Sequence, residues 1–236
     1  MKPAYKRILL KLSGEGLAKA EQTGIDLATV SRLAKEIAAV HATGVEIGIV
    51  VGGGNFFRGA KKACEMLDRS VADQMGMMAT IMNGIVLKSA LEAEGCAAAV
   101  YSGLSVPQVC ETYNYTKAMQ AFKNGEVVIF AGGTGCAYFT TDTAAVLRAV
   151  EMHCDVLLKS TQVDGVYDAD PKLDPKAKRF DVIDYDTVMA NHLNVMDMTA
   201  ISMAREAKLP IMVFAQKGEN SIVDAICGKV KHTMIK

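Results

Sequence analysis

Short apolar runs alternate along the chain with segments of helical periodicity. The runs predicted as buried strands are Arg7–Leu12, Val45–Val51, Ala97–Tyr101, Val127–Phe130, Asp155–Lys159 and Ile211–Phe214. The segments predicted as helices are Asp26–His41, Val71–Glu94, Tyr115–Lys123, Asp142–Met152 and Ala200–Lys208. Strands that are buried on both faces and joined by helices predict a three-layer α/β/α sandwich around a central, mainly parallel sheet.

The chain shows no internal repeat and no low-complexity linker. Its length of 236 residues suits a single domain over residues 1–236, with two lobes that divide near residue 150. One long stretch, about Ser160–Asp184, has no clear periodicity and is rich in Asp, Lys and Pro. Loops of this length inside compact domains tend to be functional, so we expect this one to contribute to a site.

Four of the predicted strands run into loops with unusual residues. These strand-loop segments read "LLKLSGEG", "VVGGGNFFRG", "VIFAGGTGCAYFTTD" and "LLKSTQVDGVYDADP". In open parallel sheets, ligands bind at the carboxyl ends of the strands. Glycine allows successive backbone N–H groups to approach phosphate oxygens there. Three glycine loops beside Lys11 and Arg58 therefore indicate a site for several phosphates, such as two nucleotides that face one another.

The motifs of the commonest phosphate-binding enzymes are missing from these loops. G-x-x-x-x-G-K-[ST] does not occur, because Ala60 follows Gly59 where a lysine would be needed. Neither G-x-G-x-x-G nor the H-R-D and D-F-G pair of protein kinases is present. The loops therefore predict nucleotide chemistry on a different fold.

Composition excludes several other classes of protein. Lys and Arg number 26 and Asp and Glu number 26, so the sequence shows no basic excess for a nucleic-acid groove. No apolar run approaches the roughly 18 residues that span a membrane, and the N-terminus lacks a signal-peptide pattern. The 6 cysteines form no C-x-x-C pair, which predicts reduced thiols, no metal ligands and a cytoplasmic protein.

Five segments of the sequence resemble a known family. The segments "KRILLKLSGE", "GGGNFFRG", "ADQMGMMATIMNG", "GTGCAYFTTDTAA" and "STQVDGVYDADP" are similar to those of the bacterial uridylate (UMP) kinases. That family has the amino-acid kinase fold and is unrelated to the P-loop kinases. The motifs occur in matching order from Lys6 to about Phe214, which covers nearly the whole chain.

The resemblance implies transfer of the γ-phosphoryl group of Mg-ATP to UMP, with an acceptor lobe over residues 1–150 and an ATP lobe over 151–236. It implies that ATP is bound by Lys11, Leu12, Ser13, Gly14, Gly54, Arg58, Thr161, Tyr167 and Asp170. It implies that UMP is bound by Gly53, Asp73, Thr134, Gly135, Cys136, Ala137, Tyr138, Phe139, Thr140 and Thr141. Lys11 would stabilise the transferring group, Arg58 would reach between the two sets of phosphates, and Asp142 would orient the lysines.

The resemblance also implies partners. We expect Mg²⁺ to enter with ATP, UTP to inhibit at the UMP site, and the chain to form a homohexamer. Activation by GTP is doubtful, because the stretch Lys88–Lys123 has few basic residues. Relatives whose acceptor is an acid use a second lysine from a later glycine-rich loop. The corresponding region of this chain, "LNVMDMTA", contains no lysine, which fits the uridylate branch better. The role of Asp197 in that region stays open.

Alternatives remain at this stage. The acceptor could be carbamate, aspartate or glutamate, and a protein of this fold could bind ligands without turnover. Lys11 could extend from an edge strand to solvent, and Arg58 could belong to a surface ion pair. Asp73 and Asp142 could be ordinary first-turn residues of helices. Tyr167 could flank a turn without contacting adenine. The methionines Met75, Met77, Met78 and Met82 are expected to form a packed helix face.

Overall fold

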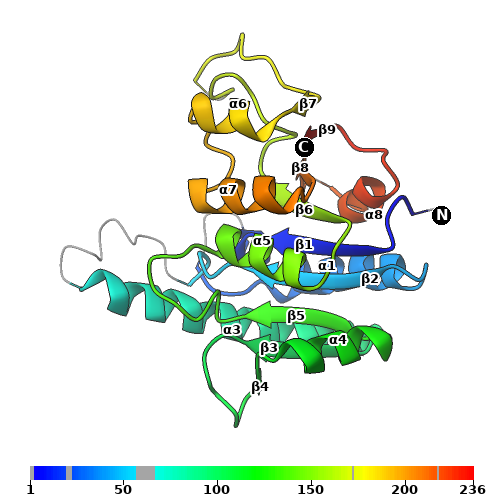
Figure 1. Ribbon diagram of the computed structural model, residues 1–236. Coiled ribbons are helices and arrows are strands. Elements are labelled where there is room, and N and C mark those ends of the chain that lie inside the picture. The colour runs from blue at the N-terminus through cyan, green and yellow to red at the C-terminus, as the bar shows by residue number, and fades with distance from the viewer. Residues whose placement is uncertain (1–2, 20–22, 57–66, 172, 217) are drawn as a thin grey trace.

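The computed structural model describes residues 3–19, 23–56, 67–171, 173–216 and 218–236. Its core is a 9-stranded sheet in the order β4-β3-β5-β2-β1-β6-β8-β9-β7 (Figure 1). The strands are β1 Arg7–Leu12, β2 Glu46–Val51, β3 Ala98–Ser102, β4 Glu111–Thr112, β5 Val127–Ala131, β6 Val156–Thr161, β7 Val182–Ile183, β8 Ile211–Ala215 and β9 His232–Ile235. Every neighbouring pair is parallel except β8 and β9, which are antiparallel.

Helices cover both faces of this sheet. They are a short 3-10 helix η1 Gly14–Leu17, followed by α1 Leu27–His41, α3 Arg69–Ala93, α4 Tyr115–Lys123, α5 Thr141–Glu151, α6 Tyr185–Ala190, α7 Met198–Ala207 and α8 Ser221–Ile226. One apolar core joins the sheet to α1, α3 and α8, and a second joins its other face to α4, α5, α6 and α7. The predicted three-layer α/β/α sandwich is therefore confirmed (Figure 1).

The predicted elements agree with the structure to within one or two residues at most ends. Asp26, predicted as the first residue of a helix, is the N-cap of α1, and its carboxylate accepts a hydrogen bond from Thr29 N at 3.1 Å. Asp155, predicted to begin a strand, lies just before β6, and its carboxylate accepts from Lys6 N and Arg7 N. Each carboxylate therefore satisfies backbone N–H groups at an element end, as short acidic side chains often do.

The sequence analysis missed several short elements. These are η1, β4, β7, β9, α6 and α8, none longer than 6 residues. The long stretch predicted as irregular over Ser160–Asp184 is shorter than expected, because β6 continues to Thr161 and β7 lies near its end. Between them, Tyr167 and Arg179 form an antiparallel bridge that folds the loop back on itself.

The order of the strands divides the sheet at the pair β1–β6. Strands from the first 150 residues lie on one side of this pair, and strands β6 to β9 lie on the other. The register of the pair places Lys11 beside Lys159. A single sheet therefore runs through both halves of the chain and brings two lysines from distant segments together.

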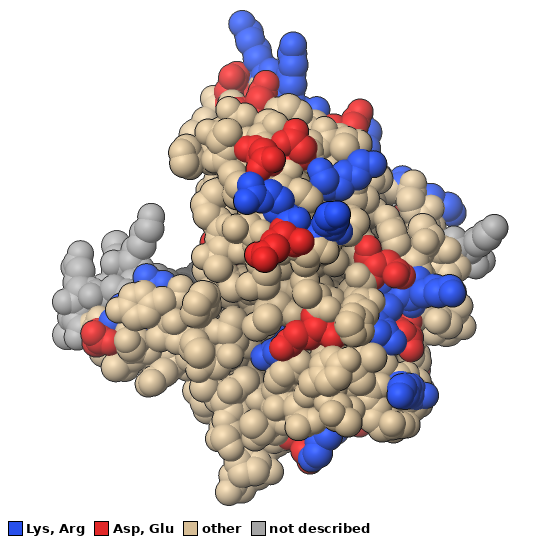
Figure 2. Space-filling view, viewed as in Figure 1, with Lys and Arg blue, Asp and Glu red and all other residues tan. Residues whose placement is uncertain are grey.

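Figure 2 shows Lys and Arg side chains interspersed with Asp and Glu on the face in view. This mixed pattern agrees with the balanced charge of the sequence. In the part of the chain that the structure describes, no helix combines the length and apolar character needed to cross a membrane.

A buried carboxylate joins α1 to α8. The N-cap residue of α8, Asn220, has a positive φ of 64° and its side chain makes no capping hydrogen bond. Glu36 of α1 provides the cap, since its Oε2 atom accepts a hydrogen bond from Ile222 N at 3.0 Å. Its Oε1 atom pairs with Arg32 at 2.7 Å. A carboxylate at a helix N-terminus both satisfies an N–H group and interacts favourably with the helix dipole.

We expect Glu36→Ala to lower the free energy of unfolding by about 1–3 kcal/mol, because Ile222 N would be left buried without an acceptor. Urea denaturation would measure the change, and Glu206→Ala on the exposed side of α7 is the control, with an expected effect of about 0.5 kcal/mol or less. Equal midpoints for the two variants would show that Glu36 does not stabilise this contact.

Candidate active site

Two buried lysines and one aspartate form a compact charged group at the middle of the sheet. Lys11 lies in β1 and Lys159 in β6, and the side chains of both are 11% exposed. Asp142, in the first turn of α5, lies between them. Its Oδ1 atom is 2.8 Å from Lys11 Nζ and its Oδ2 atom is 2.6 Å from Lys159 Nζ. One carboxylate therefore pairs with two ammonium groups.

The environment of this group shifts the protonation of its members. Burial alone would raise the pKa of the Asp142 carboxyl, but the charges of Lys11 and Lys159, with the hydrogen bond from Lys159, outweigh it and lower that pKa below its ordinary value. Burial lowers the pKa of the Lys159 ammonium, against the opposing attraction of Asp142. Asp142 is thus held ionised, and a carboxylate with a lowered pKa is a poor proton acceptor.

The contact with Lys11 is an ion pair without good hydrogen-bond alignment. Among the described residues, none donates an aligned hydrogen bond to Asp142 Oδ1, although Lys11 Nζ lies 2.8 Å away. A lysine ammonium carries three N–H donors. Lys11 therefore retains donors for a further anion.

The N-terminus of α5, which carries Asp142, is fixed by neighbouring side chains. Thr140 is the N-cap, and its Oγ1 atom accepts a hydrogen bond from Asp142 N at 3.0 Å. Asp197, the N-cap of α7, in turn accepts from Thr140 Oγ1 at 2.5 Å and from Thr143 Oγ1 at 2.9 Å. The role of Asp197 that the sequence left open is thus structural in part: it ties the start of α7 to the start of α5.

The first two glycine loops touch each other through their backbones. A Cβ atom on Gly14 would lie 2.5 Å from Gly54 N and 2.7 Å from Gly52 O, distances that no side chain can occupy. The two loops are also joined by a hydrogen bond from Gly52 N to Leu12 O at 2.9 Å. Glycine is required at Gly14 because the strand ends β1 and β2 place these loops in direct contact.

The third glycine loop connects β5 to α5 and contains several residues of positive φ. Gly132, Gly133 and Gly135 have φ values of 68°, 57° and 83°, and Tyr138 has a φ of 70°. The unusual backbone at Tyr138 is held by Asp73 of α3, whose Oδ2 atom accepts a hydrogen bond from Tyr138 N at 2.7 Å. Arg69 completes this contact, because it pairs with Asp73 at 2.9 Å and its guanidinium lies 5.2 Å from the centre of the Tyr138 ring.

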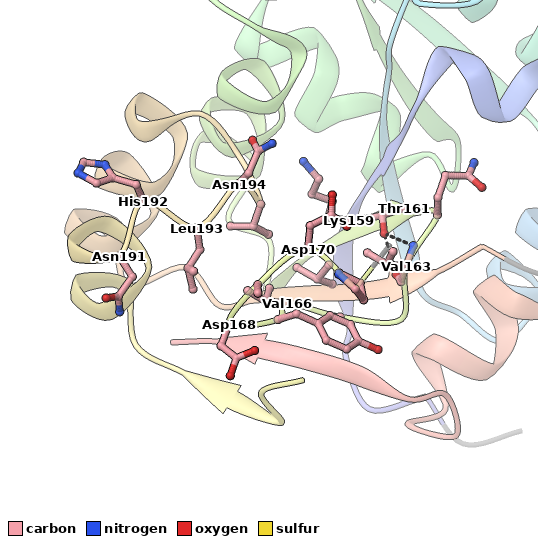
Figure 3. A pocket seen from close by; sticks show the side chains of 17 residues that line it. Lys159, Thr161, Val163, Val166, Asp168, Asp170, Asn191, His192, Leu193 and Asn194 are labelled. Carbon is pink, nitrogen blue, oxygen red and sulfur yellow. Dashed lines mark hydrogen bonds between the residues drawn. The ribbon is translucent and has the colours of Figure 1, made fainter. Parts of the chain in front are cut away.

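A pocket of about 610 Å³ opens beside Lys159. Figure 3 shows Lys159 and Thr161 on one side of this pocket and Asn191, His192 and Leu193 on the opposite side. The apolar residues in the walls of the pocket are Val163, Val166, Leu193, Val195 and Val213. Its size and its mixture of apolar walls with a few polar groups suit a small organic ligand, and Lys159 gives it a cationic end.

The residues expected to bind ATP fall into two groups. Thr161, Tyr167 and Asp170 all line the pocket. Leu12, Ser13, Gly14 and Gly54 lie instead where the first two glycine loops meet; the Leu12 side chain is buried in the core, and Ser13 caps η1. Lys159 and Asp142 link the two groups, since Lys159 lines the pocket and shares Asp142 with Lys11. Arg58 lies outside the described residues.

The residues expected to bind UMP lie along the second and third loops and on α3. Gly53 packs against α3, where a Cβ atom would be 2.8 Å from Gly76 O. The segment from Thr134 to Thr141 begins close to Gly132 and ends at the cap of α5. Within it, Cys136, Tyr138, Phe139 and Thr140 are exposed, whereas Gly135, Ala137 and Thr141 are partly buried.

Lys159 was missed by the sequence analysis. Its signal was present, because "LLKST" in the later strand repeats the pattern of "LLKLS" in the first strand. A lysine near the end of an otherwise apolar strand is costly to bury and therefore indicates a partner charge or a ligand.

Comparisons with known proteins agree with this fold. Residues 6–215 match the amino acid kinase family. The uridylate kinase of Azorhizobium caulinodans is 50% identical over 231 residues, which cover 98% of this chain and 97% of that protein. The structure of a UMP kinase from Ureaplasma parvum superposes with a TM-score of 0.93 at 36% identity over 100% of both chains. A UMP kinase structure from Bacillus anthracis gives a TM-score of 0.94 at 35% identity, covering 100% of this chain and 97% of that one.

The central ion pairs give a testable dependence on pH. We expect Asp142→Asn to lower the free energy of unfolding at neutral pH by about 3 kcal/mol, because two lysines would remain buried without their counter-charge. The folded chain holds the pKa of Asp142 below its ordinary value of 3.8, so the unfolded chain binds more protons in that range. The contribution of Asp142 is therefore present above about pH 3.8 and is lost as the pH falls through the folded pKa.

Urea denaturation of wild type and Asp142→Asn from neutral pH to below pH 3.8 tests this expectation. The difference between their free energies of unfolding should stay constant down to about pH 3.8 and narrow below it. Asp186→Asn is a matched control, since its ion pair with Arg205 is exposed and should contribute about 1 kcal/mol or less. A difference that stays constant with pH would contradict the assignment.

Proposed function

The chain belongs to the amino acid kinase family, and we propose that it transfers the γ-phosphoryl group of ATP to UMP, giving UDP and ADP, a step of pyrimidine nucleotide biosynthesis. The observation that carries the proposal is the group formed by Lys11, Asp142 and Lys159. It joins a nucleotide-sized pocket to a set of glycine loops, which is the arrangement that transfer between two phosphates requires.

ATP is proposed to bind with its nucleoside in the pocket and its phosphates toward Lys11. Thr161, Tyr167 and Asp170 would contact the nucleoside, and Lys159 at the edge of the pocket would meet the phosphates. Ser13, Gly14 and Gly54 would offer backbone N–H groups to the phosphates, because their side chains are small or absent.

UMP is proposed to bind along the second and third glycine loops. Gly53 and the Thr134–Thr141 segment would surround it, and Asp73 would hold its nucleoside. In the structure the Asp73 carboxylate is already bonded to Arg69 and to Tyr138 N. UMP would therefore share the Asp73 carboxylate with these partners. Asp73 would then both hold the loop between β5 and α5 and bind the ligand. Arg58, in the role that the family resemblance implies, would reach the acceptor phosphate.

The transfer itself needs charge stabilisation more than acid–base chemistry. The attacking oxygen belongs to a phosphate that is largely ionised at neutral pH, so no general base has to remove a proton from it. This agrees with the lowered pKa of Asp142, which suits it to hold the two lysines and not to accept a proton. Lys11 and Lys159 would then stabilise the charge on the phosphoryl group as it moves.

Mg²⁺ is the proposed cofactor. The described residues contain no cluster of three His, Cys, Asp or Glu side chains that could hold a metal ion by themselves. Mg²⁺ needs no such cluster, because it usually keeps several waters and binds through substrate phosphates. When bound with ATP, the ion would neutralise charge on the phosphates.

An assay of ADP release with Mg-ATP and UMP, CMP, dUMP, carbamate, aspartate or glutamate tests the function. We expect strong turnover with UMP, and we expect added UTP to raise the apparent KM for UMP, because UTP would occupy the same uridine site. Turnover with an amino acid or carbamate in place of UMP would overturn the proposal. Binding of UMP without turnover would indicate a protein that binds the nucleotide only.

We expect Lys11→Ala to reduce kcat by at least about a hundredfold while leaving the Kd for UMP within about threefold of wild type. The reason is that Lys11 would act on the transferring group and not on the uridine. Steady-state kinetics and calorimetric titration with UMP measure the two quantities. Unchanged kcat would remove Lys11 from the mechanism.

The chain is further proposed to assemble as a homohexamer. The expectation that the α3 methionines pack within the chain is wrong for three of the four: Met77 is buried, but Met75, Met78 and Met82 are 43–46% exposed. They continue a stripe of exposed apolar residues along α3 that comprises Val71, Met75, Met78, Met82 and Ile85. A self-complementary stripe on a long helix suits a twofold contact with a second copy, and a hexamer needs a further contact between such pairs.

We expect Met78→Glu, at the centre of the stripe, to shift the protein toward smaller species, because a second copy would bury the new charge. Sedimentation velocity measures the assembly, and Leu173→Glu, at an exposed apolar residue far from α3 in the sequence, is the control. An assembly equal to that of wild type would show that this stripe is not an interface.

Two further expectations complete the proposal. The continuous sheet supports one domain with an acceptor lobe over residues 1–150 and an ATP lobe over 151–236. A cytoplasmic location is supported by the free thiols of Cys96, Cys110, Cys136, Cys154 and Cys227 in the described part of the chain.

A further inference from the structure

Helix α3 makes side-chain hydrogen bonds to both glycine loops that are proposed to hold the acceptor. Thr80 and Asn83 lie one turn apart on α3 and are 2% and 0% exposed. Thr80 Oγ1 accepts a hydrogen bond from Gly132 N at 2.7 Å, in the loop after β5. Asn83 Nδ2 donates to Gly52 O at 2.7 Å, in the loop after β2. Residues three apart lie on the same face of a helix, so α3 reaches both loops from one surface.

The contact at Asn83 is part of a fully bonded amide pair. Asn83 Nδ2 also donates to Asn55 Oδ1 at 2.8 Å, and Asn55 Nδ2 donates to Asn83 Oδ1 at 2.9 Å. The second proton of Asn55 Nδ2 is given to Gly24 O at 2.9 Å. Both side chains are completely buried. All four amide protons are therefore used, and a buried network of this kind specifies one arrangement of its members.

The contact at Thr80 is also complete. Its hydroxyl donates to Met77 O within α3 at 2.7 Å and accepts from Gly132 N, so it uses its proton and a lone pair. Gly53 packs directly on the same part of α3, where a Cβ atom would be 2.9 Å from Ala79 Cβ and 3.4 Å from Thr80 N. The helix and the second loop thus meet without space for adjustment.

We propose that Thr80 and Asn83 are positioning residues that fix the separation of the two loops and thereby the fit of the acceptor nucleotide. The inference rests on the proposed function, because it takes these loops as the UMP site. Without the two hydrogen bonds, neither loop would be tied to α3, and the distance between the loops would no longer be fixed. The pocket beside Lys159 has neither residue in its lining, and the loop that Thr80 holds contributes no residue to the proposed ATP site, so a change at Thr80 is expected to alter ATP binding little.

The test compares Thr80→Val, which keeps the shape but removes the hydroxyl, with Thr80→Ser, which keeps the hydroxyl. We expect Thr80→Val to raise the KM for UMP about tenfold, a factor that corresponds to about 1.4 kcal/mol, while the KM for ATP stays within about twofold. Thr80→Ser should restore the wild-type value. Hydrogen exchange at Gly132 N should be faster in Thr80→Val only, because its acceptor is lost.

Tyr185→Phe is a matched control, since Tyr185 lies on α6, away from both loops, and its buried hydroxyl donates to Leu209 O. It should lower the melting temperature without changing the KM for UMP. If Thr80→Val behaves as Tyr185→Phe does, with unchanged KM for UMP and unchanged exchange at Gly132, the proposal is overturned and Thr80 has only a structural role.

Asn83→Asp gives a second test if Thr80→Val does not fold. An ionised carboxylate cannot donate to Gly52 O, whereas a protonated one can. The affinity of Asn83→Asp for UMP, relative to wild type, should therefore recover as the pH falls, and a ratio that is independent of pH would contradict the proposal. Absence of UMP turnover in the wild type would instead contradict the proposed function itself, so the two failures are distinguishable.

Discussion

The structure depends on one carboxylate between two buried lysines. Two ammonium groups of adjacent strands would repel each other and lose much of their hydration if they were buried alone. Asp142 offsets both effects, because each of its oxygens lies within 2.8 Å of one lysine. The arrangement requires β1 and β6 to be neighbours in register and α5 to begin beside their ends. The fold and the proposed chemistry therefore depend on the same contact.

The loops around this group are organised by close backbone contacts and by α3. Glycines at the ends of β1 and β2 let these loops touch each other, so here the absence of side chains serves packing as much as access to a ligand. The inner face of α3 holds the second and third loops through Thr80 and Asn83, and its outer face carries the apolar stripe. One helix thus lies between the proposed acceptor site and the proposed contact with a second copy.

Local pattern was sufficient for the long elements of the fold, because β1, for example, is a distinct apolar run and α4 has a clear helical period. It was insufficient for Lys159, whose importance comes from a neighbour far away in the chain that only the order of strands reveals. The exposed methionines of α3 show a second limit: periodicity indicates which residues share a face but not what covers that face. The ATP and UMP residues came from family resemblance, and the structure adds which of them line one pocket.

We propose that one active site holds both nucleotides, with Lys11, Asp142 and Lys159 between their phosphates. The most direct measurement is calorimetric titration with a bisubstrate analogue, in which adenosine and uridine are joined through their 5′ positions by a polyphosphate chain. We expect one analogue to bind per chain, more tightly than ATP or UMP, and to exclude both nucleotides once it is bound. Competition with only one of the two nucleotides, or binding no tighter than that of ATP alone, would contradict it.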